Sequence, residues 1–210
     1  VSYGLRLTVT EETIDTLPQS IEFLCQETLC GTMQAEPAFD HGRARTGGRS
    51  VKSGRRFAGA FLSAYDIAAD RRRYLFYSGA RPQVLTSTFC QAPETALIVN
   101  NEGKLTACYE IFHSSLESAH HFFIGEVDPS GQIVFDEKKR IRLREMIRER
   151  RRLCRGCFCY WHCAGDCPAK TITGKGGSHL RFGLRCRINR EITKGLLVRH
   201  IHQSRGLWQG

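Results

Sequence analysis

The sequence lacks any long apolar run, since no stretch approaches the roughly 18 consecutive apolar residues that a membrane-spanning helix needs. Its first residues, VSYGLRLTVT, contain no basic segment followed by an apolar core, so they do not resemble an export signal. We therefore expect a soluble, cytoplasmic protein. The chain begins at Val1, directly in a strand-like run, and we interpret it as a piece of a longer protein.

Acidic residues are few as well: 21 Asp and Glu stand against 31 Lys and Arg, which gives a formal net charge of +10. Such an excess is typical of proteins with an anionic partner, for example a nucleic acid. The excess of positive charge is better explained by buried metal clusters, because a [4Fe-4S] cluster on four thiolates carries a formal charge of about −2 that Lys and Arg can offset. No aromatic platform or base-reading motif accompanies the basic stretches 41–56 and 136–153, so nucleic acid is an unlikely partner.

Cysteine, in contrast, is abundant, with ten residues in 210. In a small secreted protein this number would predict disulfides. The chain is longer than such proteins and has no export signal, so thiolates that hold a metal are the better interpretation. Soft ligands of this kind select iron-sulfur clusters or zinc.

The first third of the chain predicts two β/α units. Residues 4–10 and 32–39 have the alternation and β-branched content of strands, and residues 16–31 between them have helical spacing. After the basic, glycine-rich loop, residues 57–73 predict a second helix. A strand, a helix and a strand with short connections indicate parallel pairing, so we expect an α/β domain here.

The character of the sequence changes from Tyr74 onward. The runs ALIVN and KLTACYEIF flank a turn at residues 100–103 and predict a hairpin. Residues 136–153 predict a very basic surface helix with a narrow apolar stripe. Residues 174–178 predict a flexible link, and a closing helix is expected to begin at Asn189 as its N-cap.

Seven cysteines and one glycine follow a regular spacing. Pairs of cysteines two or three residues apart can direct both sulfurs toward one metal, although a single such pair is weak evidence. Reading from the N-terminus, the pattern is Cys90, twelve residues, Gly103, four residues, Cys108; then Cys154, two residues, Cys157, five residues, Cys163, three residues, Cys167, eighteen residues and Cys186.

This combined pattern resembles the SPASM domain of radical S-adenosylmethionine enzymes, which include sulfatase-maturing enzymes and maturases of ribosomal peptides. The run EPAFDHGRA at residues 36–44 resembles a segment that follows the last strand of the family's barrel. The resemblance spans essentially the whole chain. It implies the last two β/α units of a partial (β/α)6 barrel over 1–75, a small cysteine-rich α+β SPASM domain over 76–188, and a closing helix and tail over 189–210.

The resemblance also implies two auxiliary [4Fe-4S] clusters with separate ligands. Cluster I would take Cys90, Cys108 and Cys167, and cluster II would take Cys154, Cys157, Cys163 and Cys186. Sulfatase-maturing members add a ligand six positions after the first cysteine, where this chain has Ala96, so the fourth ligand of cluster I stays open. Cys159 is a candidate for an extra ligand, whereas Cys25 and Cys30 have the pattern of ordinary helix residues.

A few polar and aromatic residues are weaker candidates. Asp166 resembles an acidic position of some family members at which a carboxylate accepts a substrate proton, but capping of the local turn is the interpretation that we favour. Glu36, at the end of the second strand, is a candidate for contact with cofactor or substrate at the barrel mouth. We interpret His162, beside Trp161, as aromatic cover for a cluster rather than as a ligand.

The C-x3-C-x2-C motif of the S-adenosylmethionine cluster is missing from the sequence. The resemblance therefore implies the C-terminal half of a radical oxidoreductase that modifies a peptide or protein side chain, inactive alone, with S-adenosylmethionine bound only in the full-length parent. Its partners would be a peptide or protein substrate, with an acidic leader, and an electron donor such as a flavodoxin or ferredoxin. The alternative is a zinc-stapled binding module for nucleic acid or an acidic peptide.

Overall fold

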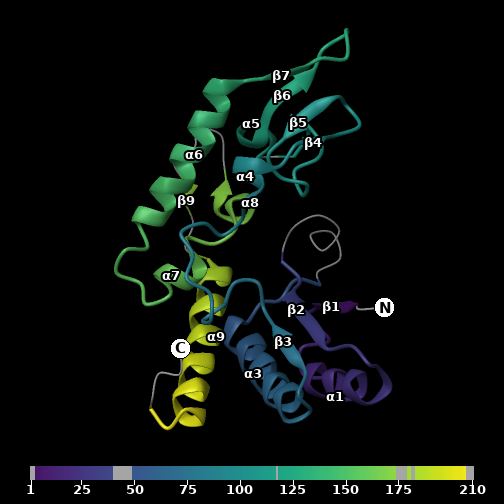
Figure 1. Cartoon of the computed structure of the whole chain (residues 1–210), viewed down its shortest axis with the longest axis vertical. Helices are drawn as coiled ribbons and strands as arrows, with labels where there is room; N and C mark the ends of the chain where they lie inside the picture. Colours follow the sequence, from purple (N-terminus) through teal and green to yellow (C-terminus); the bar gives the residue numbers. More distant parts are fainter. Residues whose placement is uncertain (1–2, 40–48, 117, 174–178, 181–182, 207–210) are drawn as a thin grey trace. The chain divides into compact units, whose positions relative to one another are not determined.

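The computed structural model describes residues 3–39, 49–116, 118–173, 179–180 and 183–206 (Figure 1). The predicted link at 174–178 and residues 41–48 of the loop predicted over 41–56 fall outside these residues; the prediction of a loop is wrong for residues 54–56, which belong to a helix. The chain forms two compact units, Val1–Leu85 with Gly183–Gly210 and Thr86–Phe182. Every helix in the described part of the chain is too short or too polar to cross a lipid bilayer.

The first unit contains a parallel sheet of three strands, β1 (Gly4–Val9), β2 (Thr32–Pro37) and β3 (Tyr74–Phe76). The central strand β2 pairs in parallel with both neighbours. Helix α1 (Leu17–Glu27) connects β1 to β2, and helix α3 (Gly54–Asp70) leads toward β3. The predicted α/β character is confirmed, but the described strands form an open sheet and not a closed barrel.

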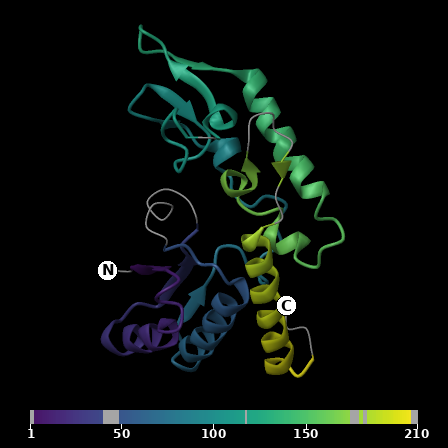
Figure 2. The same ribbon diagram turned by 180° about the vertical axis from the view of Figure 1, so that it is seen from behind.

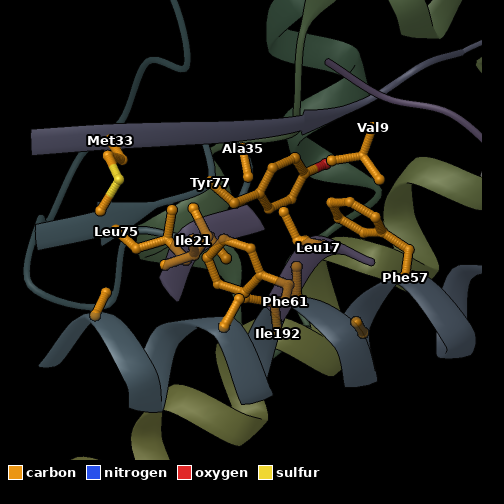
Figure 3. Packing of buried hydrophobic residues seen from close by; sticks show 14 of the residues in the cluster. Val9, Leu17, Ile21, Met33, Ala35, Phe57, Phe61, Leu75, Tyr77 and Ile192 are labelled. Atoms are coloured by element: carbon orange, nitrogen blue, oxygen red, sulfur yellow. The ribbon is translucent and has the colours of Figure 1, made fainter. Parts of the chain in front are cut away.

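The core of the first unit lies between this sheet and its helices (Figure 3). Phe57 and Phe61 on α3 are fully buried and meet the ring of Tyr77 edge to face, with centroid distances of 6.0 and 6.3 Å. Burial of one such ring stabilises the fold by about 1.5–3 kcal/mol. Helix α1 supplies Leu17 and Ile21 to the same core, so both crossover helices are fixed by apolar packing.

The closing helix begins earlier than predicted. Helix α9 spans Leu184–Gln203 and lies alongside α3 in both views (Figure 1 and Figure 2). The prediction that Asn189 caps its start is wrong, because Gly183 is the N-cap. Asn189 is buried inside the helix, where its Oδ1 accepts a 2.8 Å hydrogen bond from the hydroxyl of Tyr77.

The second unit contains an antiparallel sheet in the order β4 (Ile98–Val99), β5 (Lys104–Thr106), β6 (Phe123–Val127) and β7 (Ile133–Phe135). The predicted hairpin joins β4 to β5. Gly103 has φ +71°, a conformation that favours glycine, and the Asn100 Oδ1 accepts hydrogen bonds from the backbone N–H groups of Glu102 and Lys104.

The predicted basic helix is α6 (Glu137–Arg152), which begins after the N-cap Asp136; the Asp136 carboxylate accepts the N–H of Lys139 at 3.0 Å. Leu143 and Met146 are buried against the sheet and complete the core of this unit. The remaining elements are short: α4 (Ala92–Thr95), α5 (Ala119–Phe122), α7 (Tyr160–Cys163), α8 (Pro168–Thr171), β8 (Ile172–Thr173) and β9 (His179–Leu180).

Gly79 makes the close approach between Tyr77 and Asn189 possible. A Cβ atom at Gly79 would lie 2.7 Å from the Asn189 Cγ and 2.8 Å from the Tyr77 Cε1. We therefore expect Gly79→Ala to lower the free energy of unfolding by about 1–3 kcal/mol, because the buried pair must move apart. Urea denaturation of the full chain, followed by circular dichroism, measures this change.

Gly59→Ala is the matched control. Gly59 lies in α3, and a Cβ atom there would meet nothing within 4 Å. Alanine in an exposed helix position should raise the free energy of unfolding by about 0.5–1 kcal/mol. Equal effects of the two substitutions would show that the space around Gly79 does not limit stability.

Candidate metal centre

The second unit contains six of the seven cysteines of the regular pattern, all of them partly exposed. They are Cys90, Cys108, Cys154, Cys157, Cys163 and Cys167. The seventh, Cys186, lies in the first turn of α9, in the first unit. Cys25 and Cys30 are buried in the core of the first unit; Cys30 follows α1 instead of belonging to it.

Cys90 and Cys108 flank the β4/β5 hairpin and lie within electrostatic range of each other. The Cys90 Sγ accepts the N–H of Ala92 at 3.4 Å, in the first turn of α4. Burial raises the pKa of the Cys108 thiol above its ordinary value; the charges of Glu110 and Cys90 raise it further, against backbone N–H groups that lower it.

Cys167 belongs to the same neighbourhood as Cys108. Both side chains pack against the core of the second unit. An ion pair of 2.5 Å between Lys170 Nζ and Glu110 Oε2 also joins the segments that follow the two cysteines. Two of the three residues expected to hold cluster I, Cys108 and Cys167, thus come from segments that a shared core and this ion pair hold together.

Cys154 and Cys157 lie in consecutive turns after α6. The N–H of Cys157 donates to the carbonyl of Cys154 at 2.9 Å, and the two thiols influence each other electrostatically. Burial raises the pKa of the Cys154 thiol, the guanidinium of Arg150 lowers it, and Cys157 and Asp166 raise it. Arg150 also donates a hydrogen bond from Nη1 to the Cys154 Sγ at 3.4 Å.

A left-handed turn separates Cys163 from Cys167. Ala164, Gly165 and Asp166 have φ values of +48°, +88° and +71°, and the two non-glycine residues are buried. A non-glycine residue held in this region costs on the order of 1–3 kcal/mol, and such strain is concentrated at active sites and ligand clamps. This turn determines how the Cys163 and Cys167 side chains are presented.

Asp166 is part of that turn and is only 4% exposed. Its Oδ1 accepts the N–H of Cys167 at 2.7 Å, and its own N–H donates to the carbonyl of Cys163 at 3.0 Å. The structure therefore gives Asp166 the turn-capping role. Cys159 is buried, and its carbonyl accepts the N–H of Cys163 at 2.8 Å, so its backbone supports α7.

Within the described ranges, no three His, Cys, Asp or Glu side chains form a group that could hold a metal ion. The chemistry of the donors nevertheless fits a soft metal, because thiolates are soft ligands and the turn with Cys154 and Cys157 needs little chain to direct two sulfurs to one site.

Glu36 and three histidines lie in a strand or in short helices. Glu36 lies at the carboxyl end of β2 and is 7% exposed; its Oε1 accepts hydrogen bonds of 2.8 Å from Gln34 Nε2 and from the N–H of Ser78. His120 and His121 lie in helix α5, with ring centroids 3.8 Å apart. His162 lies in α7.

Trp161 differs from the expectation of aromatic cover, because its side chain is 53% exposed. The guanidinium of Arg151 lies 4.5 Å from the ring centroid of Tyr160 and 5.0 Å from that of Trp161. These cation–π contacts fasten α7 to the last turn of α6. The aromatic pair therefore organises the surface of the cysteine segment.

Arg150 is the residue of this site that the sequence did not single out. It is 3% exposed, yet in the sequence it is one basic residue among many in α6. Only its position one helical turn before Cys154 could have indicated a contact with that cysteine.

A comparison of the chain with protein-family models, curated proteins and solved structures found no match.

Proposed function

We propose that the cysteines hold two iron-sulfur clusters, and that the chain is the C-terminal half of an enzyme that modifies a peptide or protein side chain by radical chemistry. The observation that carries this proposal is the arrangement of thiols in the second unit. Cys90 and Cys108 flank the same hairpin, and Cys154 and Cys157 lie in one turn that a 2.9 Å backbone hydrogen bond closes.

The division into two ligand sets is supported by the fastening of their segments. Cys108 and Cys167 share one core and the Lys170–Glu110 ion pair, as cluster I requires. Arg144 on α6 pairs with Glu94 on α4 at 2.8 Å; this ion pair links the segment after Cys90 to the helix that leads to Cys154 and therefore connects the two sets. The assignment of Cys163 and Cys186 to cluster II stays a prediction.

The chemistry that the clusters would supply is one-electron transfer. The chain's own residues would hold and orient them: thiolates bind iron, the left-handed turn spaces Cys163 from Cys167, and the buried Arg150 donates to a ligand sulfur. Basic residues around the site would offset the negative charge of the clusters. Flavodoxin or ferredoxin remains the proposed class of electron donor, and a peptide or protein with an acidic leader the proposed substrate.

A zinc-stapled binding module is the second candidate, and one observation favours it. Phe158 and Trp161 are exposed within ten residues of the exposed Arg152 and Arg155, so aromatic rings do accompany the basic helix. Stacking rings beside arginines suit single-stranded nucleic acid. The exposed Glu145 and Glu149 interrupt the positive charge along α6, which makes this surface a poor track for a phosphate backbone.

Metal content separates the two functions. Purified without oxygen, the chain should be brown, with broad visible absorption and about eight irons per chain, as two four-iron clusters require. Iron and zinc are measured by elemental analysis of the same sample. A colourless protein with stoichiometric zinc would contradict the cluster proposal and favour the binding module.

The ligand sets predict the effect of single substitutions. Cys157→Ala should remove cluster II and leave cluster I, so that iron falls to about four per chain. Cys25→Ala is the control, because Cys25 is buried in the first unit and belongs to neither set. Unchanged iron in the Cys157 variant would refute its assignment, and loss of all iron would refute the separation of the two sets.

A further inference from the structure

Arg150 is a buried charge at the end of a helix whose other basic side chains are mostly exposed or half-buried. Charged side chains are almost never fully buried unless they are paired or have a function. Its neighbour Arg152, also in the last turn of α6, is exposed. Arg150 interacts favourably with the helix C-terminus, and its buried guanidinium also lies beside the cysteine segment.

Arg150 contacts Cys154 through its side chain and through its backbone carbonyl. Its Nη1 donates to the Cys154 Sγ at 3.4 Å, within the range for a hydrogen bond to sulfur. The Cys154 thiol lies 3.6 Å from the Arg150 carbonyl, to which it donates. Side chain and backbone of one residue thus hold the same sulfur from two directions.

Arg150 also contacts the left-handed turn. A Cβ atom built on Gly165 would lie 3.5 Å from the Arg151 Cα and 3.7 Å from the Arg150 Cγ. The turn therefore packs directly on the last turn of α6. The charge of Asp166, in this turn, also acts on the Cys154 thiol. Arg150 thus bonds the sulfur of one ligand through Nη1 and lies close to the turn that spaces two others through Cγ.

We propose that Arg150 is a positioning residue that fixes the Cys154 sulfur and stabilises the reduced state of the cluster that Cys154 holds. The inference rests on the proposed function above. A cluster gains one negative charge when it accepts an electron from a reduced flavin or iron-sulfur carrier protein, and no bond or proton needs to move. A buried N–H donor and positive charge at a ligand sulfur stabilise that added charge.

The test is a redox titration of the full chain, followed by electron paramagnetic resonance. In Arg150→Gln, we expect the reduced-to-oxidised ratio of one cluster at a fixed potential to fall about tenfold, which is ~59 mV for a one-electron couple. The other cluster and the iron content should not change. Arg152→Gln removes the same charge from an exposed neighbour and should leave both clusters as they are.

Two outcomes would overturn the inference with the clusters intact: unchanged potentials in Arg150→Gln, or an equal shift in Arg152→Gln, which would indicate a general charge effect. If Arg150→Gln loses iron, Arg150→Lys decides. Lysine retains a buried N–H donor but lacks the planar guanidinium of arginine. We therefore expect the cluster to be retained and its reduced-to-oxidised ratio at a fixed potential to change about threefold. An unchanged potential would overturn the inference, whereas absence of clusters from the unsubstituted chain would overturn the proposed function itself.

Discussion

The arrangement of the cysteine segment depends on the packing of a left-handed turn against the last turn of α6. Gly165 suits this turn because its φ of +88° favours glycine, and a Cβ atom there would be in van der Waals contact with the backbone of Arg151. Ala164 and Asp166 accept a strained backbone on either side of it. The contact brings the chain that follows Cys163 back to the helix that leads into Cys154. The remaining thiol positions are then fixed by short turns and by the core of the unit.

Positive charge in the second unit is organised locally. Along α6, Arg140 pairs with Glu137 and Arg144 with Glu94, while Arg151 covers two aromatic rings. The net charge of the chain is therefore not a uniform basic surface. It combines exposed arginines with paired ones and with one buried guanidinium at a cysteine, as expected where anionic groups are to be held in the interior.

The first unit has its own core and a different organisation. Its parallel strands are covered by α1 and α3, and α9 adds a second layer of contact with α3. Two of its buried polar side chains have structural partners: Glu36 joins β2 to the segment after β3, and Asn189 bonds Tyr77. In this unit the buried polar side chains join segments that are distant in the sequence. In the second unit the buried Arg150 instead contacts a cysteine.

The sequence by itself determined the features that depend on neighbouring residues: the two β/α units, the hairpin at Gly103, the basic helix α6 and the spacing of the cysteines. These follow from periodicity, turn chemistry and propensity, which act over a few residues. Only the tertiary structure decided which groups are buried together. The roles of Asn189 and Arg150 depend on contacts with Tyr77 and with a strained turn, and long-range packing of this kind leaves no periodic signal in the chain.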